Sequence, residues 1–266
     1  RRPGRRPVTG GAARASLALA RRALRNAFRR PQFLAPLVVF PSLFLAVNVG
    51  GLERTTELPG FEEVNGFLDF QLAAAITQST LLGGVTAGIA TALEIEGGFF
   101  DRLVASPIPR VALVFGRLIA TGVLGMLQVL WFLVAGLLFG AEIVGGVPGA
   151  LLVVAIGACS GVAFGALGMF LAFRAKNAST VQGIFPLVFV ILFVSSAFFP
   201  RHLLQPPADW LADYNPLSYI AEGMRDPIIG AISADTVLYG FAAAIGIAAL
   251  GTLAAIGALR GRLREA

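Results

Sequence analysis

Long uncharged stretches alternate with short polar segments along the 266 residues of the chain. A helix crosses a hydrocarbon core of ~30 Å with ~20 residues, because each residue adds ~1.5 Å. Six stretches suit that length, and we place them at residues 33–51, 67–93, 111–139, 147–173, 183–199 and 236–259. With 56% hydrophobic and 14% charged residues, and a mean hydropathy of +0.79, the composition agrees. The pattern therefore predicts an all-α polytopic membrane protein with six transmembrane helices.

A basic amphipathic segment precedes the first apolar stretch. Wound as a helix, residues 15–30 gather arginines on one side, with a largely apolar side opposite. The arginines are Arg14, Arg21, Arg22, Arg25 and Arg29, and the apolar residues are Leu17, Ala20, Leu24, Ala27 and Phe28. We expect an interfacial helix attracted by anionic lipid. A signal peptide is the alternative, but the following apolar stretch is too long for one.

The positive charge is distributed unevenly over the loops, and this predicts the orientation. With the N-terminus inside, cytoplasmic segments hold 18 of the 21 basic residues. The expected organisation is a cytoplasmic tail and amphipathic helix at 1–32, a transmembrane domain at 33–259 and a cytoplasmic tail at 260–266. Because the basic residues serve topology, we expect no nucleic-acid partner. Lys176 is the one lysine among 20 arginines, which suggests a GC-rich bacterial genome and thus a bacterial inner (plasma) membrane.

The segment "EIEGGFFDRLVASPIPR", residues 94–110, separates the second and third apolar stretches. Its acids follow the C-terminal end of a helix, where the macrodipole disfavours negative charge, so we expect them to head the next element. Gly97 and Gly98 allow a reversal of the chain. A short helix then covers 99–105, and it ends because Pro107 pushes Ser106 out of the α region. The prediction is a short amphipathic helix on the cytoplasmic side.

These residues resemble the cytoplasmic loop of type-2 ATP-binding-cassette (ABC) exporter permeases. The matching positions are Glu94, Glu96, Gly97, Arg102, Ser106, Pro107, Arg110 and Gly116. A second segment, "NPLSYIAEGMRD", is similar to the asparagine-proline motif before the last span of that family. Its positions are Asn215, Pro216, Tyr219, Glu222 and Arg225. Within the family, the daunorubicin-resistance type of drug and lipid exporter is the most similar subgroup.

The resemblance implies a coupling helix between spans 2 and 3 that docks on a separate ATPase. The residues expected to couple are Glu94, Glu96, Gly97, Phe99, Phe100, Arg102, Leu103, Pro107 and Arg110. It also implies an outside re-entrant segment between spans 5 and 6, and a dimer with a second permease copy or a related chain. The expected function is export of a hydrophobic or amphipathic cargo such as a drug, natural product or lipid, as in multidrug resistance.

The sequence contains no P-loop, since its only lysine, Lys176, is followed by asparagine. We therefore expect no enzyme activity and no cofactor in this chain, with ATP and magnesium bound by a P-loop ATPase partner. Membrane lipid is the third expected partner. A lone cysteine inside a span, Cys159, and a lone histidine, His202, predict no metal site.

The apolar stretches contain few polar groups. Asp69 lies near the outer end of the second stretch, where we expect water to reach it. Gln78 and Gln128, with a stripe of Phe185, Phe189 and Phe193, form a candidate substrate path, although such a stripe more often packs or faces lipid. Glycine pairs at helical spacing predict close packing of helices. They are Gly84 and Gly88, Gly136 and Gly140, and the series Gly157, Gly161 and Gly165.

Two other classes of function stay open at this point. An intramembrane lipid-modifying enzyme or protease requires paired carboxylates, a serine with a base, or histidine ligands at membrane depth, and the apolar stretches supply none. A passive channel or an assembly factor requires no energy source. The absence of a charged residue at mid-membrane also argues against a proton-driven or sodium-driven transporter.

Overall fold

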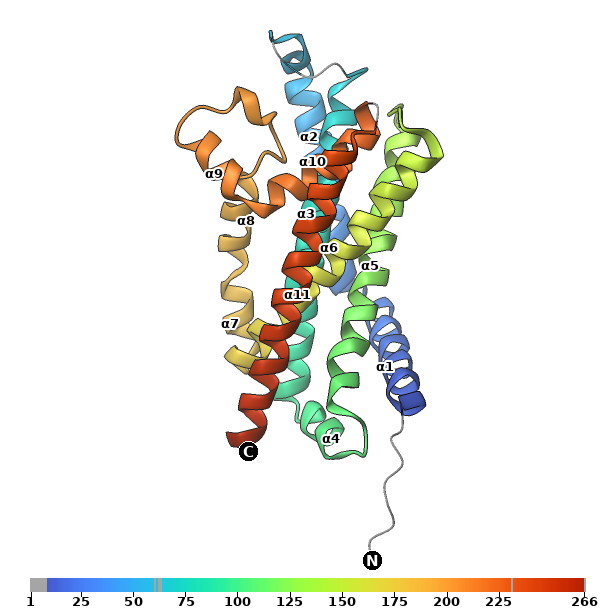
Figure 1. Cartoon of the computed structure of the whole chain (residues 1–266), viewed down its shortest axis with the longest axis vertical. Coiled ribbons are helices and arrows are strands. Elements are labelled where there is room, and N and C mark those ends of the chain that lie inside the picture. The colour runs from blue at the N-terminus through green and yellow to red at the C-terminus, as the bar shows by residue number, and fades with distance from the viewer. Residues whose placement is uncertain (1–8, 60, 62–63, 231, 266) are drawn as a thin grey trace, which may run out of the picture.

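The computed structural model describes residues 9–59, 61, 64–230 and 232–265, and the first eight residues of the expected tail lie outside them. The described residues form helices and connecting turns, with no strand (Figure 1). The α-helices are α1 (Thr9–Phe28), α2 (Pro31–Leu52), α3 (Phe67–Glu96), α4 (Phe99–Ala105), α5 (Arg110–Leu138), α6 (Gly146–Ala175), α7 (Ala178–Gly183), α8 (Phe185–Phe193), α9 (Ala208–Tyr214), α10 (Pro216–Ile229) and α11 (Ala234–Glu265). Two 3₁₀ turns, η1 (Glu53–Glu57) and η2 (Arg201–Leu203), follow α2 and α8.

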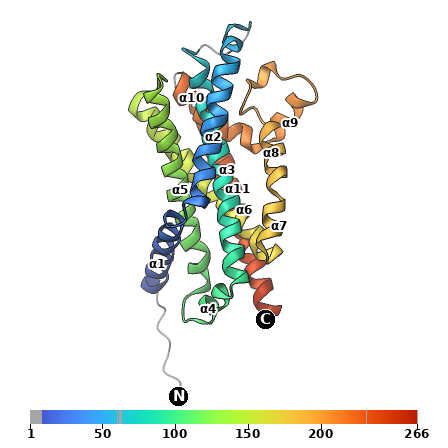
Figure 2. The same cartoon turned by 180° about the vertical axis from the view of Figure 1, so that it is seen from behind.

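Five helices in the described part of the chain are long and apolar enough to cross a membrane: α2, α3, α5, α6 and α11. They stand side by side in an elongated bundle (Figures 1 and 2). They correspond to five of the six expected spans, with α11 continuing as helix into the expected tail at 260–265. The structure is thus an all-helical bundle with five candidate membrane spans.

The expected span at 183–199 is not a single long helix like the other five. It consists of two short helices, α7 and α8, which stack end to end along the side of the bundle (Figure 2). Pro186 lies in the first turn of α8, where its missing N–H interrupts the ladder of hydrogen bonds between the two helices. The helical part ends at Phe193, because the chain turns away at Ser195 to join an outer loop. The helical part of this expected span therefore begins earlier and ends earlier than 183–199, and it is divided in two at Ile184.

Glycines allow α3 to pack closely on α6, and α6 on α5. A Cβ atom on Gly88 of α3 would lie 2.8 Å from the carbonyl oxygen of Gly168 in α6, and a Cβ on Gly125 of α5 would lie 2.8 Å from that of Gly157. Such contacts replace side-chain packing with backbone packing. Gly140 is an exception to the prediction, because it lies beyond α5 in a turn with φ +94° and packs against nothing within 4 Å.

Helix α1 runs obliquely beside the lower part of α5 (Figure 1). Ser16 and Ala20 are buried against α5, where a Cβ on Gly116 would lie only 2.9 Å from the carbonyl oxygen of Ser16. Two residues of the expected apolar face, Leu17 and Phe28, are instead 60% and 58% exposed. α1 therefore has a face for the bundle and a second apolar face directed away from it.

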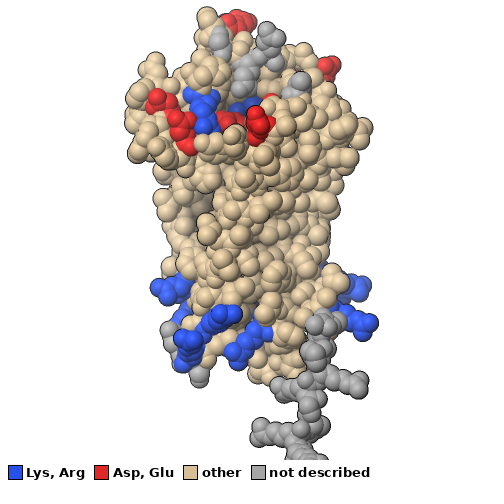
Figure 3. All heavy atoms as spheres, in the orientation of Figure 1, with Lys and Arg blue, Asp and Glu red and all other residues tan. Residues whose placement is uncertain are grey.

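The two ends of the bundle differ in charge. On the visible face, lysine and arginine side chains gather at the lower end, and the middle is free of charge (Figure 3). Acidic side chains gather at the upper end, together with some cationic ones. α4, the start of α1 and the end of α11 lie at the lower end, and α9 and α10 at the upper end. Asp69 is only 3% exposed and accepts a hydrogen bond from the backbone N–H of Glu142 (3.1 Å). It also lines a cavity of about 420 Å³ with Asn65 and Val144, so the expectation that water reaches it stays a prediction.

Candidate functional site

Helix α4 has the bounds that the sequence predicts. It begins after Gly98, whose φ of +66° lies in the left-handed region that glycine adopts without strain. It ends at Ala105, because Ser106 is extended (φ −76°, ψ 157°) ahead of Pro107. The hydroxyl of Ser106 donates to the carbonyl oxygen of Leu103 (2.5 Å) and satisfies one of the last carbonyls of the helix.

One face of α4 is anchored to the bundle. The ring of Phe100 is fully buried and lies 5.3 Å from the ring of Phe173 in α6, between centroids. It belongs to a lower core cluster that includes Met169 and Leu259. Phe99, Leu103 and Val104 are partly buried on the same side.

Two arginines from other helices also contact α4. The guanidinium of Arg22 in α1 lies 3.8 Å from the ring centroid of Phe99, which is a cation–π contact. Arg262 of α11 forms an ion pair with Asp101 (3.0 Å), and its guanidinium lies 5.6 Å from the ring of Phe100. The first helix and the last helix of the described chain therefore meet on α4.

The two glutamates before α4 belong to the last turn of α3 and do not head the next helix as predicted. Glu94 pairs with Arg117 of α5 and with Arg22 of α1 (3.3 Å), while Arg117 also donates to the hydroxyl of Thr91 (2.7 Å). Glu96 accepts a hydrogen bond from the backbone N–H of Ala178 (2.8 Å), at the start of α7. Cationic partners and a free backbone donor offset the unfavourable end of the dipole.

Other residues of the predicted coupling set face outward. Arg102, Pro107 and Arg110 are exposed. The side chain of neither arginine forms a hydrogen bond or ion pair with another residue of the described chain. The segment thus has an inner face that holds it and an outer face that offers two free cations beside a rigid proline turn.

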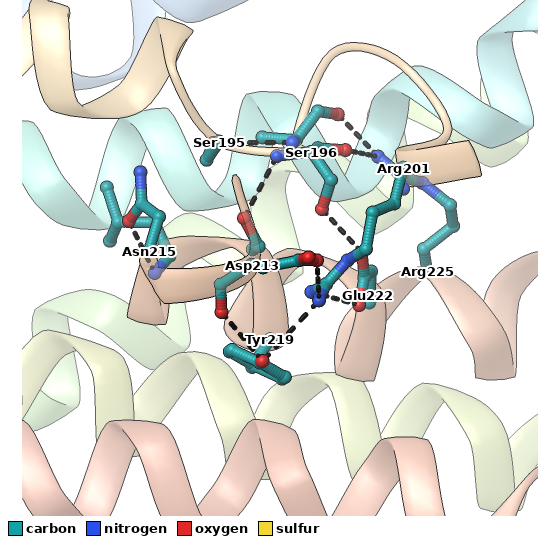
Figure 4. A network of polar contacts seen from close by, with 11 residues as sticks. Ser195, Ser196, Arg201, Asp213, Asn215, Tyr219, Glu222 and Arg225 are labelled. Carbon is teal, nitrogen blue, oxygen red and sulfur yellow. Dashed lines mark hydrogen bonds and ion pairs between the residues drawn. The ribbon is translucent and has the colours of Figure 1, made fainter. Parts of the chain in front are cut away.

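The second predicted motif lies at the upper end and forms a dense polar network (Figure 4). Asn215 caps α10 by accepting from the N–H of Leu217 (3.0 Å), and its amide donates to the carbonyl oxygen of Ile191 in α8 (2.6 Å). Pro216 occupies the first turn, where no N–H is required. The motif therefore fixes the start of α10 and joins it to α8.

Glu222 and Arg201 form a bidentate ion pair (Figure 4). Nε and Nη2 of Arg201 each lie 3.0 Å from a carboxylate oxygen of Glu222. Glu222 also accepts from the hydroxyl of Ser196 (2.5 Å), and Arg201 pairs with Asp213 (2.9 Å) and lies 4.6 Å from the ring of Tyr219. Burial alone would lower the pKa of Arg201, but its bonds to Tyr219 and Glu222 raise it overall. Arg201 therefore stays charged.

Arg225 is 2% exposed. Its guanidinium lies 3.8 Å from the ring centroid of Phe70 in α3 and donates to the carbonyl oxygens of Ser196 (3.1 Å) and Ala197. Sequence reasoning did not identify Arg201, Ser196 or Phe70 as members of this network. The acids at 213 and 222 gave a signal for a cationic partner, but not for which one.

None of the five residues of the candidate substrate path lines either of two cavities found among the described residues, one beside Asp69 and one between α1, α2, α3 and α5. Phe189 and Phe193 pack edge-on against Phe40 and Phe44 of α2, with ring centroids 5.5 and 5.9 Å apart. Gln128 donates to the carbonyl oxygen of Ser79 (3.2 Å). Gln78 is buried, and both polar atoms of its side chain lack a hydrogen-bond partner among the residues that the structure describes. This path stays a prediction.

No group of three His, Cys, Asp or Glu side chains converges on a metal position among the described residues. The site consists instead of a short surface helix at one end and an ion-pair network at the other. A sequence model of the ABC-2 type transporter family matches residues 14–229, which is more than half of the chain and includes both motifs. The chain belongs to the ABC-2 type transporter family.

Two curated relatives of this ABC-2 protein are also named as transport permeases. It is 27% identical over 210 residues to the ycf38 protein of Porphyra purpurea, whose name describes a transport permease, and 24% identical over 217 residues to ycf38 of Pyropia yezoensis. Each match covers 78% of this chain and 72% of the relative. These findings support a multi-pass membrane permease rather than an enzyme, and membership of the family implies an ATPase partner.

Proposed function

We propose that this ABC-2 protein is the permease subunit of an exporter that moves a hydrophobic or amphipathic cargo, a drug, natural product or lipid, out of the cytoplasm or inner leaflet. ATP and magnesium would bind in a separate P-loop ATPase. The lower end of the bundle would face the cytoplasm of a bacterium, because the lysine and arginine side chains gather there (Figure 3). α7 and α8 together would form the sixth crossing.

The observation that supports this function most directly is that α4 has one face packed on the bundle and one exposed face. Its inner face is tied to α1, α6 and α11, so a force on α4 reaches three helices of the bundle. Its outer face presents Arg102, with Pro107 and Arg110 beside it. A docking surface requires such polar contacts together with a rigid support.

A second copy of the chain would complete the translocation path. α2 and α11 bury only a small share of their apolar surface within one chain. In a dimer, part of this surface would be covered, and the rest would contact lipid. Cargo would pass between the two copies as the ATPases close and open.

The test of the ATPase partner is co-purification. The tagged chain is co-expressed with the ATPase encoded nearest to its gene, and ATP hydrolysis of the purified complex is measured. We expect Arg102→Glu to lower ATPase recovery at least tenfold without loss of the permease from the membrane. Arg174→Glu reverses an exposed charge at the end of α6 and serves as the matched control. Equal recovery with both variants would contradict the proposal.

The orientation has its own test. In a Cys159→Ala background, Ser106→Cys and Tyr214→Cys place one thiol at each end of the bundle. A maleimide that cannot cross the membrane should label the cysteine at 214 in intact cells and the cysteine at 106 only after the cells are opened. The reverse pattern would place α4 outside and remove the basis for ATPase docking.

A further inference from the structure

A cavity of about 380 Å³ lies between α1, α2, α3 and α5, next to α4. Its inner part is apolar, with Leu34 and Leu37 of α2, Ala87 of α3 and Leu124 of α5 among its walls. At ~30 Å³ for a group the size of a water molecule, it holds roughly a dozen such groups. This is room for a phosphate-sized head and part of one hydrocarbon chain.

The mouth of the cavity is cationic. Arg22, Arg30 and Arg117 contribute three positive charges, and Glu94 contributes one negative charge, which leaves a formal charge of +2. The amide of Asn26 lies at the same rim. A neutral or cationic ligand would gain nothing from this rim, whereas an anion would be attracted.

The arginines at the rim differ in whether their side chains already have an acidic partner. Arg117 and Arg22 share the carboxylate of Glu94, and the side chain of Arg22 is 37% exposed. Arg30 is exposed, and the side chains of Arg30 and Asn26 have no hydrogen-bond or ion-pair partner in the part of the chain that the structure describes. Arg30, Asn26 and the remaining donors of Arg22 are therefore available together.

An apolar interior with a cationic rim matches an amphiphile that has an anionic head. We propose that this cavity binds an anionic phospholipid of the surrounding leaflet, with its phosphate at Arg22 and Arg30 and one acyl chain beside Leu37. The apolar residues Leu17 and Phe28, on the exposed face of α1, place the rim at the level of a membrane interface. The proposal rests on the membrane placement of the bundle and not on an ATPase or a cargo.

Occupation of the cavity would act on the coupling helix. Arg22 contacts both Glu94 of α3 and the ring of Phe99 in α4. A phosphate bound to Arg22 would hold α1 at its present position against α4. The lipid would then serve as a resident part of the lower end, and not as material that passes through it.

Native mass spectrometry of the purified full chain tests the proposal, because it counts bound lipids without nucleotide or ATPase. The probes are dioleoyl phosphatidylglycerol and dioleoyl phosphatidylcholine at equal concentration. We expect the first lipid to bind about fivefold more tightly when it is phosphatidylglycerol, since each basic residue near a membrane surface contributes about that factor. Equal affinity of the two lipids would overturn the proposal.

Two matched pairs of variants locate the site. Arg30→Gln should remove the preference for phosphatidylglycerol, while Arg29→Gln, which changes an exposed neighbour outside the cavity, should keep it. Ala87→Phe should fill the apolar part and lower the binding of both lipids, while Ala35→Phe on the exposed side of α2 should not. Equal effects within either pair would show diffuse surface binding and overturn the proposal. Failure of ATPase co-purification would leave these results unchanged.

Discussion

The two ends of the bundle are held in different ways. At the upper end, Arg201, Glu222 and Arg225 form hydrogen bonds to side chains and carbonyl oxygens of neighbouring loops, and Arg225 is almost wholly buried. At the lower end, α4 is held by the buried ring of Phe100 and by Arg22 and Arg262, and its outer face is exposed. The upper end is therefore held in one arrangement by its own contacts, whereas the outer face of α4 at the lower end is open to the proposed ATPase.

The largest loss of stability should follow Arg225→Ala. The change removes a buried cation from the ring of Phe70 and leaves the carbonyl oxygens of Ser196 and Ala197 without a donor. We expect a loss of about 3 kcal/mol in the free energy of unfolding. Reversible unfolding in mixed detergent micelles measures it. Arg54→Ala, at an exposed arginine of the same end, should change stability by less than about 0.5 kcal/mol.

The ion pair of Arg201 and Glu222 should make a smaller contribution to the free energy of unfolding. Its two parallel hydrogen bonds are partly buried, so a double-mutant cycle of Arg201→Gln and Glu222→Gln should give a coupling energy of about 1–2 kcal/mol. A coupling near zero would mean that Ser196 and Asp213, and not the pair itself, hold the loop.

Substitution of Gln78 should increase stability, unlike the two changes above. Both polar atoms of its buried side chain lack a partner, so Gln78→Leu should raise stability by about 1 kcal/mol. Gln128→Leu removes the bond to the carbonyl oxygen of Ser79 and should lower stability by a similar amount. Melting temperatures of the two variants in detergent provide the comparison. A lower melting temperature for Gln78→Leu would show that the amide has a partner in solution.

The smallest effect on stability belongs to the lower end. Asp101 is 62% exposed at its side chain, and exposed ion pairs contribute little. Asp101→Asn should therefore change the free energy of unfolding by less than about 0.5 kcal/mol. If the proposed ATPase binds at the lower end, Asp101→Asn should still alter ATP hydrolysis by the complex of permease and ATPase. A large loss of stability would show that α4 is part of the structural core.

Local features of the fold were predictable from the sequence. The apolar stretches gave five of the long helices, and Gly98 with Ser106–Pro107 gave both ends of α4, because backbone preferences act within a few residues. The break before Phe185 was harder to predict. Pro186 favours a kink, but the early end of α8 depends on Ser196 joining the distant network through Ser218 and Glu222.

The partners of the charged residues could not be predicted in the same way. Glu94 joins Arg22 and Arg117, which are 72 and 23 residues away along the chain, and only the packing of α1 and α5 on α3 brings them together. The same holds for Arg201, which lies 21 residues before Glu222. Charge patterns identify groups that require a partner, and tertiary packing selects the partner.

Helix α3 runs without a proline from Phe67 to Glu96. Thirty residues at ~1.5 Å each give a rod of ~45 Å. Phe70 near its top lies under Arg225, and Glu94 near its foot holds Arg22 and Arg117. Because the rod has no proline at which it could bend, a tilt imposed at its foot would be transmitted along its length towards Phe70. The contacts of Arg225 with Phe70, Ser196 and Ala197 would then act as the pivot, holding the upper end of α3 in place while the foot moves.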